Sequence, residues 1–239
     1  GVVAHQVGDH EASVELISKA IQASPSAPAY HCNLGNALYE LGRLDEAAAS
    51  QRQAIALNPD YAMAHNNLGN VLLAQGHRDE AAANYQKAVN LNPDDAQAHL
   101  KLGDILNVQG RWEEAAGSYH KALALVPDNA EALTNLGNIL TSLGRPQDAA
   151  ASYQKAIALK PDLTEAHNNL GNALKELGMA KDAVTSYRRA LDLKPDFAKA
   201  RYGLGSAYLD LGQHKEGLQC EQEGHGVIEF SSNTKTQEF

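Results

Sequence analysis

Two rows of polar side chains recur along the chain at an interval of 34 residues. They form pairs three residues apart: Asn33 and Asn36, Asn67 and Asn70, Lys101 and Asp104, Asn135 and Asn138, and Asn169 and Asn172. An asparagine amide carries both a hydrogen-bond donor and an acceptor. It can therefore bond the N–H and C=O groups of an extended peptide without requiring a particular side chain. Two rows of such amides indicate a surface that recognises a peptide backbone.

A second interpretation of these amides is structural, since each of them could bond to a neighbouring helix instead. This alternative stays open for both rows. However, asparagine is a poor helix former, and the Asn-Asn pairs at 66–67 and 168–169 disfavour a helix by propensity alone. We therefore expect these residues to have a role beyond helix stability.

Histidines recur at the same interval, as His31, His65, His99 and His167, which raises the hypothesis of a metal site. Equivalent positions on stacked helices are about 10 Å apart, whereas a metal–nitrogen bond is about 2 Å long. One ion cannot bridge neighbouring members of the row. We expect these histidines to be packed or bonded to water, and we expect no metal and no cofactor.

The sequence lacks the common motifs of catalysis. It contains no HExxH, no paired CxxC, no phosphate-binding loop and no GxSxG. The carboxylates fall mainly at places that face water in a helical array. The chain is therefore predicted to be noncatalytic, although an enzyme domain in a longer parent chain remains open.

The elements that must position the amide rows follow from the same period. Leu34, Leu38 and Leu41 lie on one helical face, and Ala47 and Ile55 give a second helix its own apolar stripe. This pattern returns in each unit, and it predicts an array of similar helical hairpins. The prolines that close the units are Pro25, Pro59, Pro93, Pro127, Pro161 and Pro195.

Two sets of glycines have different expected roles. Those that follow the first stripe are placed where a positive φ would end a helix. A second set, from Gly35 to Gly205, falls in mid-helix despite a cost of about 1 kcal/mol relative to alanine. We expect close helix packing there, with tyrosines of the second helix filling the wider gap. The first set is Gly42, Gly76, Gly110, Gly144, Gly178 and Gly212, and the tyrosines are Tyr85, Tyr119, Tyr153 and Tyr187.

This pattern, with Leu-Gly early, Ala at places 20 and 27, Tyr at place 24 and Pro at place 32, resembles the tetratricopeptide repeat (TPR). The resemblance covers residues 1–223 and implies an all-α, right-handed superhelical solenoid of antiparallel helix pairs. Residues 224–239 form a non-repeat tail. The expected units are a partial repeat at 1–27, complete repeats at 28–61, 62–95, 96–129, 130–163 and 164–197, and a degenerate last repeat at 198–223.

The resemblance also implies where a ligand would bind. In this family the first helices line the concave groove, and places 2, 5, 6, 9, 12 and 13 of each unit face it. The two amide rows occupy places 6 and 9. Asparagine at place 9 is frequent in the family, which favours a structural role for that row. The place-6 row resembles the asparagine ladder of O-linked N-acetylglucosamine transferases, which holds extended substrate polypeptide.

We therefore predict a noncatalytic protein–protein interaction scaffold that binds an extended peptide or protein segment in its groove. The alternative is the substrate-recruiting arm of a larger glycosyltransferase-like enzyme. The carboxylate clamp of some cochaperones is disfavoured, because both of its outer lysines are missing. Asp104, one turn from Lys101, would also repel a terminal carboxylate. The residues at the five clamp places are Cys32, Asn36, Asn67, Gln97 and Lys101.

The net charge of −9 argues against nucleic acid or an anionic membrane as a partner and slightly favours basic ligands. No apolar run approaches the roughly 20 residues that span a bilayer, and no signal peptide is recognisable. Cys32 and Cys220 lie five repeats apart, too distant for an intrachain disulfide, and are expected to be buried or half-buried thiols. A cytoplasmic location is predicted, although the chain starts without Met and could have lost an upstream segment.

The two ends suggest self-association through the terminal repeats or the tail. At the first end, Ile17 and Ile21 are expected to lose part of their cover. The tail offers the apolar residues Val227, Ile228 and Phe230 without a following repeat. Trp112, the single tryptophan, takes the place of Leu44 in another unit, and we expect it to anchor the core.

Overall fold

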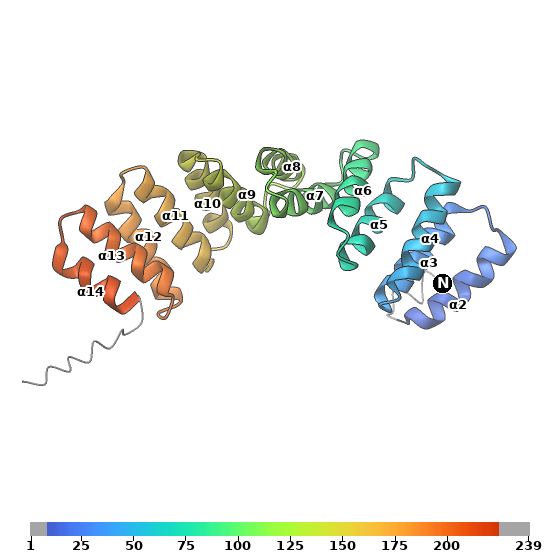
Figure 1. Ribbon diagram of the computed structural model, residues 1–239, viewed down its shortest axis with the longest axis horizontal. Helices are drawn as coiled ribbons and strands as arrows, with labels where there is room; N and C mark the ends of the chain where they lie inside the picture. Colours follow the sequence, from blue (N-terminus) through green and yellow to red (C-terminus); the bar gives the residue numbers. More distant parts are fainter. Residues whose placement is uncertain (1–8, 225–239) are drawn as a thin grey trace, which may run out of the picture. The chain divides into compact units, whose positions relative to one another are not determined.

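The computed structural model describes residues 9–224, and every regular element in this stretch is an α-helix (Figure 1). The predicted all-α class is therefore confirmed. The chain divides into two compact units, Gly1–Pro127 and Asp128–Phe239. The single array predicted over residues 1–223, its repeat boundaries and its superhelical sense remain predictions. The apolar tail residues lie outside the described residues.

Helices α3, α5, α7, α9, α11 and α13 are the first helices of the predicted repeats, and each is joined to a second helix by a short turn (Figure 1). The N-terminal unit contains α2 (His10–Ala23), α3 (Pro28–Glu40), α4 (Leu44–Leu57), α5 (Ala62–Ala74), α6 (Arg78–Leu91), α7 (Ala96–Val108) and α8 (Trp112–Leu125). The C-terminal unit contains α9 (Ala130–Ser142), α10 (Pro146–Leu159), α11 (Thr164–Glu176), α12 (Ala180–Leu193), α13 (Ala198–Asp210) and α14 (His214–Gly224).

The turn between the two helices of a repeat is closed by a glycine, as predicted. All six of these glycines have a positive φ, between 66° and 84°. At the end of α3, the N–H of Gly42 donates to the carbonyl of Tyr39, and the N–H of Arg43 donates to the carbonyl of Leu38 at 2.9 Å. This is the Schellman arrangement, which pairs carbonyls that the helix end leaves unbonded.

The mid-helix glycines allow close packing, also as predicted. A Cβ atom added to Gly69 would lie 2.9 Å from the ring of Tyr85, and one on Gly137 would lie 2.5 Å from the ring of Tyr153. The buried tyrosine rings therefore occupy the space that a side chain would need. The first complete repeat differs, because the buried Gln51 takes the tyrosine's place over Gly35. The sequence-based prediction named only the tyrosines and missed this substitute.

The histidines of the row form hydrogen bonds with the loops that precede the first helices. The Nε2 atoms of His65 and His99 each lie 3.0 Å from a proline carbonyl six residues earlier, and His31 and His167 make the same contact. Arg201 donates to the Pro195 carbonyl at the equivalent place. The expectation of packed histidines is confirmed for His65, His99 and His167, which are buried, and the bond from each ring to the backbone is a contact that the sequence did not predict.

One expectation about packing is wrong, and a second is wrong in part. Trp112 is 39% exposed. It is the first residue of α8, so no preceding turn of the same helix covers its side chain. Ile17 is only 5% exposed, so the expected loss of cover is wrong for Ile17, whereas Ile21 is half-buried. The thiols behave as predicted, because Cys32 is buried and Cys220 is half-buried.

The two units differ in the polar bonds that join one repeat to the next. In the N-terminal unit these bonds lie mainly near the turns, where Gln75 donates to Asp45 at 2.8 Å and Gln109 donates to Asp79 at 2.7 Å. In the C-terminal unit they come from the first helices and from α12. The bonds there are Asn169 to Asn138 at 2.9 Å, Lys175 to Ser206 at 2.6 Å and Arg188 to Tyr208 at 2.5 Å.

Candidate functional site

The ten residues proposed from the sequence all lie on first helices, and none of them is buried. Places 6 and 9 of a repeat are three residues apart, so their side chains share one side of the helix. We call this surface the amide face and describe it separately for each unit. In the N-terminal unit it comprises Asn33, Asn36, Asn67, Asn70, Lys101 and Asp104, and in the C-terminal unit Asn135, Asn138, Asn169 and Asn172.

At place 9 the side-chain oxygen is held by the second helix of the same repeat. The Tyr85 hydroxyl donates to Oδ1 of Asn70 at 2.6 Å, and Tyr119 donates to Asp104 in the same way. In the first complete repeat, Nε2 of Gln51 donates to Oδ1 of Asn36 at 2.9 Å. The structural interpretation of this row is therefore correct for its oxygens. In the C-terminal unit, Tyr153 donates to Asn138 at 2.8 Å and Tyr187 to Asn172 at 2.7 Å.

The place-9 amides use only half of their hydrogen-bonding capacity in this way. Within the described residues, the Nδ2 groups of Asn36, Asn70, Asn138 and Asn172 donate to no protein group. Because the oxygen is fixed by a tyrosine or glutamine, the NH₂ group is the part of the amide left for another molecule. Asp104 interrupts the row, since a carboxylate can only accept.

Tyrosine hydroxyls are protonated at neutral pH even at their ordinary pKa of about 10, and burial of these rings widens the pH range of the donor form. Removal from water raises the pKa of the Tyr85, Tyr153 and Tyr187 hydroxyls above the ordinary value for tyrosine. The nearby Tyr39 and Asp104 raise the pKa of Tyr85 further. These hydroxyls therefore remain protonated at neutral pH and hold the place-9 oxygens.

The place-6 residues are bonded less regularly. In the N-terminal unit, Asn67 donates to the buried Cys32 sulfur at 3.3 Å, a weak bond to a thiol whose pKa is raised by burial. In the C-terminal unit, Asn169 accepts from Asn168 at 3.0 Å and donates to Asn138. Neither Asn33 nor Lys101 makes a side-chain hydrogen bond to another described residue. The place-6 side chains therefore do not form one uniform row.

Comparison with protein families agrees with this geometry. A model described as "TPR repeat" matches residues 35–76, 137–178 and 179–212. Two models described as "Tetratricopeptide repeat" match residues 66–125 and 118–151, so the matches run without a gap from 35 to 212. The chain belongs to the tetratricopeptide repeat family. A comparison with curated protein sequences found no match.

Solved structures of TPR proteins have the same fold. One is the crystal structure of YrrB, described as "a TPR protein with an unusual peptide-binding site", with a TM-score of 0.68 and 27% identity over 74% of this chain and 91% of that chain. A crystal structure of MamA has a TM-score of 0.64 and 27% identity, and covers 66% of this chain and 92% of that chain. MamA from Desulfovibrio magneticus RS-1, at 21% identity, has a TM-score of 0.64 and covers 69% and 93%.

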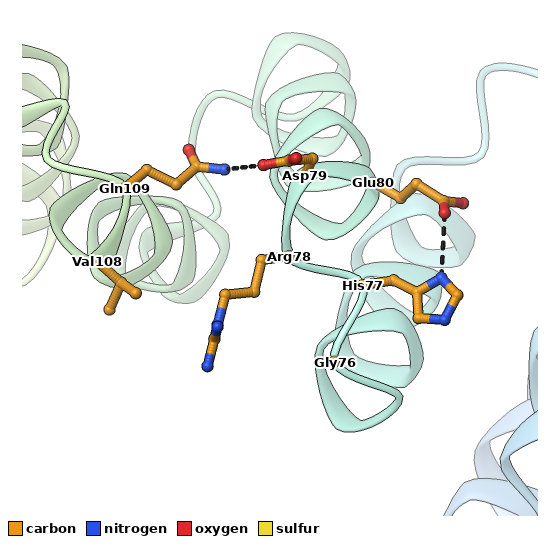
Figure 2. A pocket seen from close by; sticks show the side chains of 7 residues that line it. All are labelled: Gly76, His77, Arg78, Asp79, Glu80, Val108 and Gln109. Atoms are coloured by element: carbon orange, nitrogen blue, oxygen red, sulfur yellow. Dashed lines mark hydrogen bonds and ion pairs between the residues drawn. The ribbon is translucent and has the colours of Figure 1, made fainter.

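An open cleft of about 490 Å³ lies beside the turn of the TPR hairpin α5–α6 (Figure 2). Among the residues that line it, the Arg78 side chain projects without a partner, while His77 contacts Glu80 at 3.1 Å and Gln109 donates to Asp79. Other TPR units of this chain have Leu44 or Trp112 at the place of Arg78. Among the repeats, only this one has an arginine at that place, so the sequence does distinguish this turn from the others.

The cleft has no evident ligand chemistry, because its carboxylates are already bonded and outnumber its one permanent cation. Across the described TPR helices, no three His, Cys, Asp or Glu side chains come together as a metal site. None of these helices is both long and apolar enough to cross a membrane. The amide face is therefore the better candidate for a functional site.

Proposed function

We propose that the chain is a noncatalytic protein-interaction scaffold and that its amide face is a groove for an extended peptide segment. The observation that carries this proposal is the half-used place-9 amide. Its oxygen is held by Tyr85 or an equivalent residue, and its NH₂ group has no acceptor among the described residues. Donors of this kind match the carbonyl groups of a peptide backbone, which every sequence has.

The comparisons support a peptide ligand at the level of the family. YrrB, one of the TPR proteins with the same fold, is described as having a peptide-binding site. A scaffold of this type would make the same backbone contacts whether it acts alone or recruits substrates for a larger enzyme. The same surface would bind the peptide in an independent scaffold and in the substrate-recruiting arm of an enzyme.

The test removes the unbonded NH₂ group of the place-9 residue and keeps the hydrogen bond to its oxygen. In Asn70→Asp, the carboxylate still accepts from Tyr85, as Asp104 accepts from Tyr119 in the next repeat. Asn36→Asp changes the first complete repeat in the same way. Loss of a single hydrogen bond to a ligand is worth about 1 kcal/mol, so we expect the double variant to bind about tenfold or more weakly.

The control adds one negative charge away from the amide face and is matched to the single variant Asn70→Asp. Asn90 accepts from Gln86 on the exposed side of α6 at 2.9 Å, and Asn90→Asp keeps this bond. Peptides selected from a random library on the unaltered chain would be labelled and titrated by fluorescence anisotropy. Equal loss of affinity in Asn90→Asp and Asn70→Asp, or no loss in either, would contradict the proposal. Thermal unfolding should be nearly unchanged in all variants.

A further inference from the structure

Three exposed apolar side chains of the N-terminal unit, which we call the apolar row, each lie about one helical turn after a place-9 residue of the amide face. Tyr39 on α3, Leu73 on α5 and Val108 on α7 are 36%, 37% and 67% exposed. They occupy places 12 or 13 of three successive repeats. In the C-terminal unit, places 12 and 13 of its first two repeats hold Thr141 and Ser142, and Lys175 and Glu176. The apolar row therefore distinguishes the first unit from the second.

These apolar side chains share a helical side with the donors. Tyr39 is three residues after Asn36, and Leu73 is three residues after Asn70, which places each one turn along the same helix. A ligand that accepts from the place-9 amides would therefore also contact the apolar row.

The spacing of the row selects a backbone conformation for the ligand. The first helices α3 and α5 lie against each other, and packed helices are about 10 Å apart. A β-strand covers this distance in three residues, but it alternates sides, so residues i and i+3 point in opposite directions. A polyproline II helix has three residues per turn and advances about 9 Å in each turn. Its residues i and i+3 point the same way, in step with the repeats.

The chemistry of the face agrees with that conformation. A polyproline II helix makes no internal hydrogen bonds, so its carbonyls are available to the NH₂ groups of Asn36 and Asn70. The side chains of this face are mostly neutral, with Lys101 and Asp104 of opposite sign on one turn of α7. From the spacing, the donors and this charge balance, we propose that the N-terminal unit binds an uncharged polyproline II segment with an apolar side chain at every third residue.

This inference rests on the proposed function, and two peptides test it. Both contain twelve residues with equal numbers of Leu, Pro and Ala. One places leucine at every third residue, and the other places the same leucines at alternate residues. Binding of labelled peptide to the full chain would be measured by fluorescence anisotropy. We expect the first peptide to bind about tenfold more tightly, the effect of burying roughly one additional leucine.

Leu73→Asn should abolish this preference. Leu125→Asn is the matched control, because Leu125 is 38% exposed at the end of a second helix, away from the amide face. The Leu125→Asn variant should keep the preference for the peptide with leucine at every third residue. Equal affinity of the two peptides for the unaltered chain, or equal effects of the two substitutions, would overturn the inference and leave the proposed function standing. Binding of neither peptide would overturn the inference, whereas the library-selected peptides decide the proposed function separately.

Discussion

The two units are built from the same repeat but use its polar side chains differently. In the N-terminal unit, glutamine–aspartate bonds near the turns join the repeats, and the amide face adds the long bond from Asn67 to the Cys32 sulfur. In the C-terminal unit, Asn169 joins two repeats through Asn138 on the amide face itself. A side chain that bonds to the next repeat is less available to a ligand. Together with the apolar row, this difference supports our proposal that the first unit binds the ligand.

The largest expected effect concerns the packing of a mid-helix glycine against a tyrosine ring, which both units share. Gly69→Val and Gly137→Val should each destabilise their own unit by about 3 kcal/mol, because the new side chain meets a buried tyrosine ring. Denaturant unfolding measures this loss. The control is Gly117→Ala in α8, where a Cβ meets nothing within 4 Å and stability should rise by up to about 1 kcal/mol. A small effect at only one of the two valine sites would show that the units are packed differently.

The second effect is of intermediate size, and we expect it to differ between the two units. Asn169→Ala removes two side-chain hydrogen bonds and should lower the free energy of unfolding by about 1 to 2 kcal/mol. Asn67→Ala removes only the long bond to the Cys32 sulfur and should cost about 0.5 kcal/mol or less. Peptide affinity should show the opposite order, with the greater loss in Asn67→Ala. Stability and peptide binding would be measured in parallel on both variants. If the variant that loses more stability also loses more peptide affinity, the proposed difference between the units is wrong.

The smallest expected effect is at the turns. A double-mutant cycle on Gln109 and Asp79 should give a coupling of about 0.5 kcal/mol, since both side chains are exposed. Peptide affinity should not change in any member of the cycle. The same cycle on Gln109 and Asp45, whose carboxylate bonds to Gln75 instead, is the control and should give no coupling. A change in peptide affinity in the first cycle would argue against a purely structural role for the turn bonds.

The sequence was sufficient for features that depend on local chemistry. The helices, the glycine turns and the glycine–tyrosine packing all follow from residue types within one 34-residue unit. The bond between Asn169 and Asn138 could not be predicted, because it depends on how one first helix is rotated against the next. Gln51 was missed because the period predicted a tyrosine, although a glutamine has similar reach and also carries a donor. Trp112 was misplaced because place 17 opens a helix at its edge.

The exposed tryptophan allows the unfolding of one unit to be measured in solution. Trp112 is the only tryptophan in the chain, and it belongs to the N-terminal unit. Its fluorescence therefore reports on one unit, whereas circular dichroism records the helices of both. Transitions that coincide would mean that the units unfold cooperatively, and transitions that separate would assign each step to its unit without any label. The chain thus carries an intrinsic optical probe in the unit to which we assign the ligand.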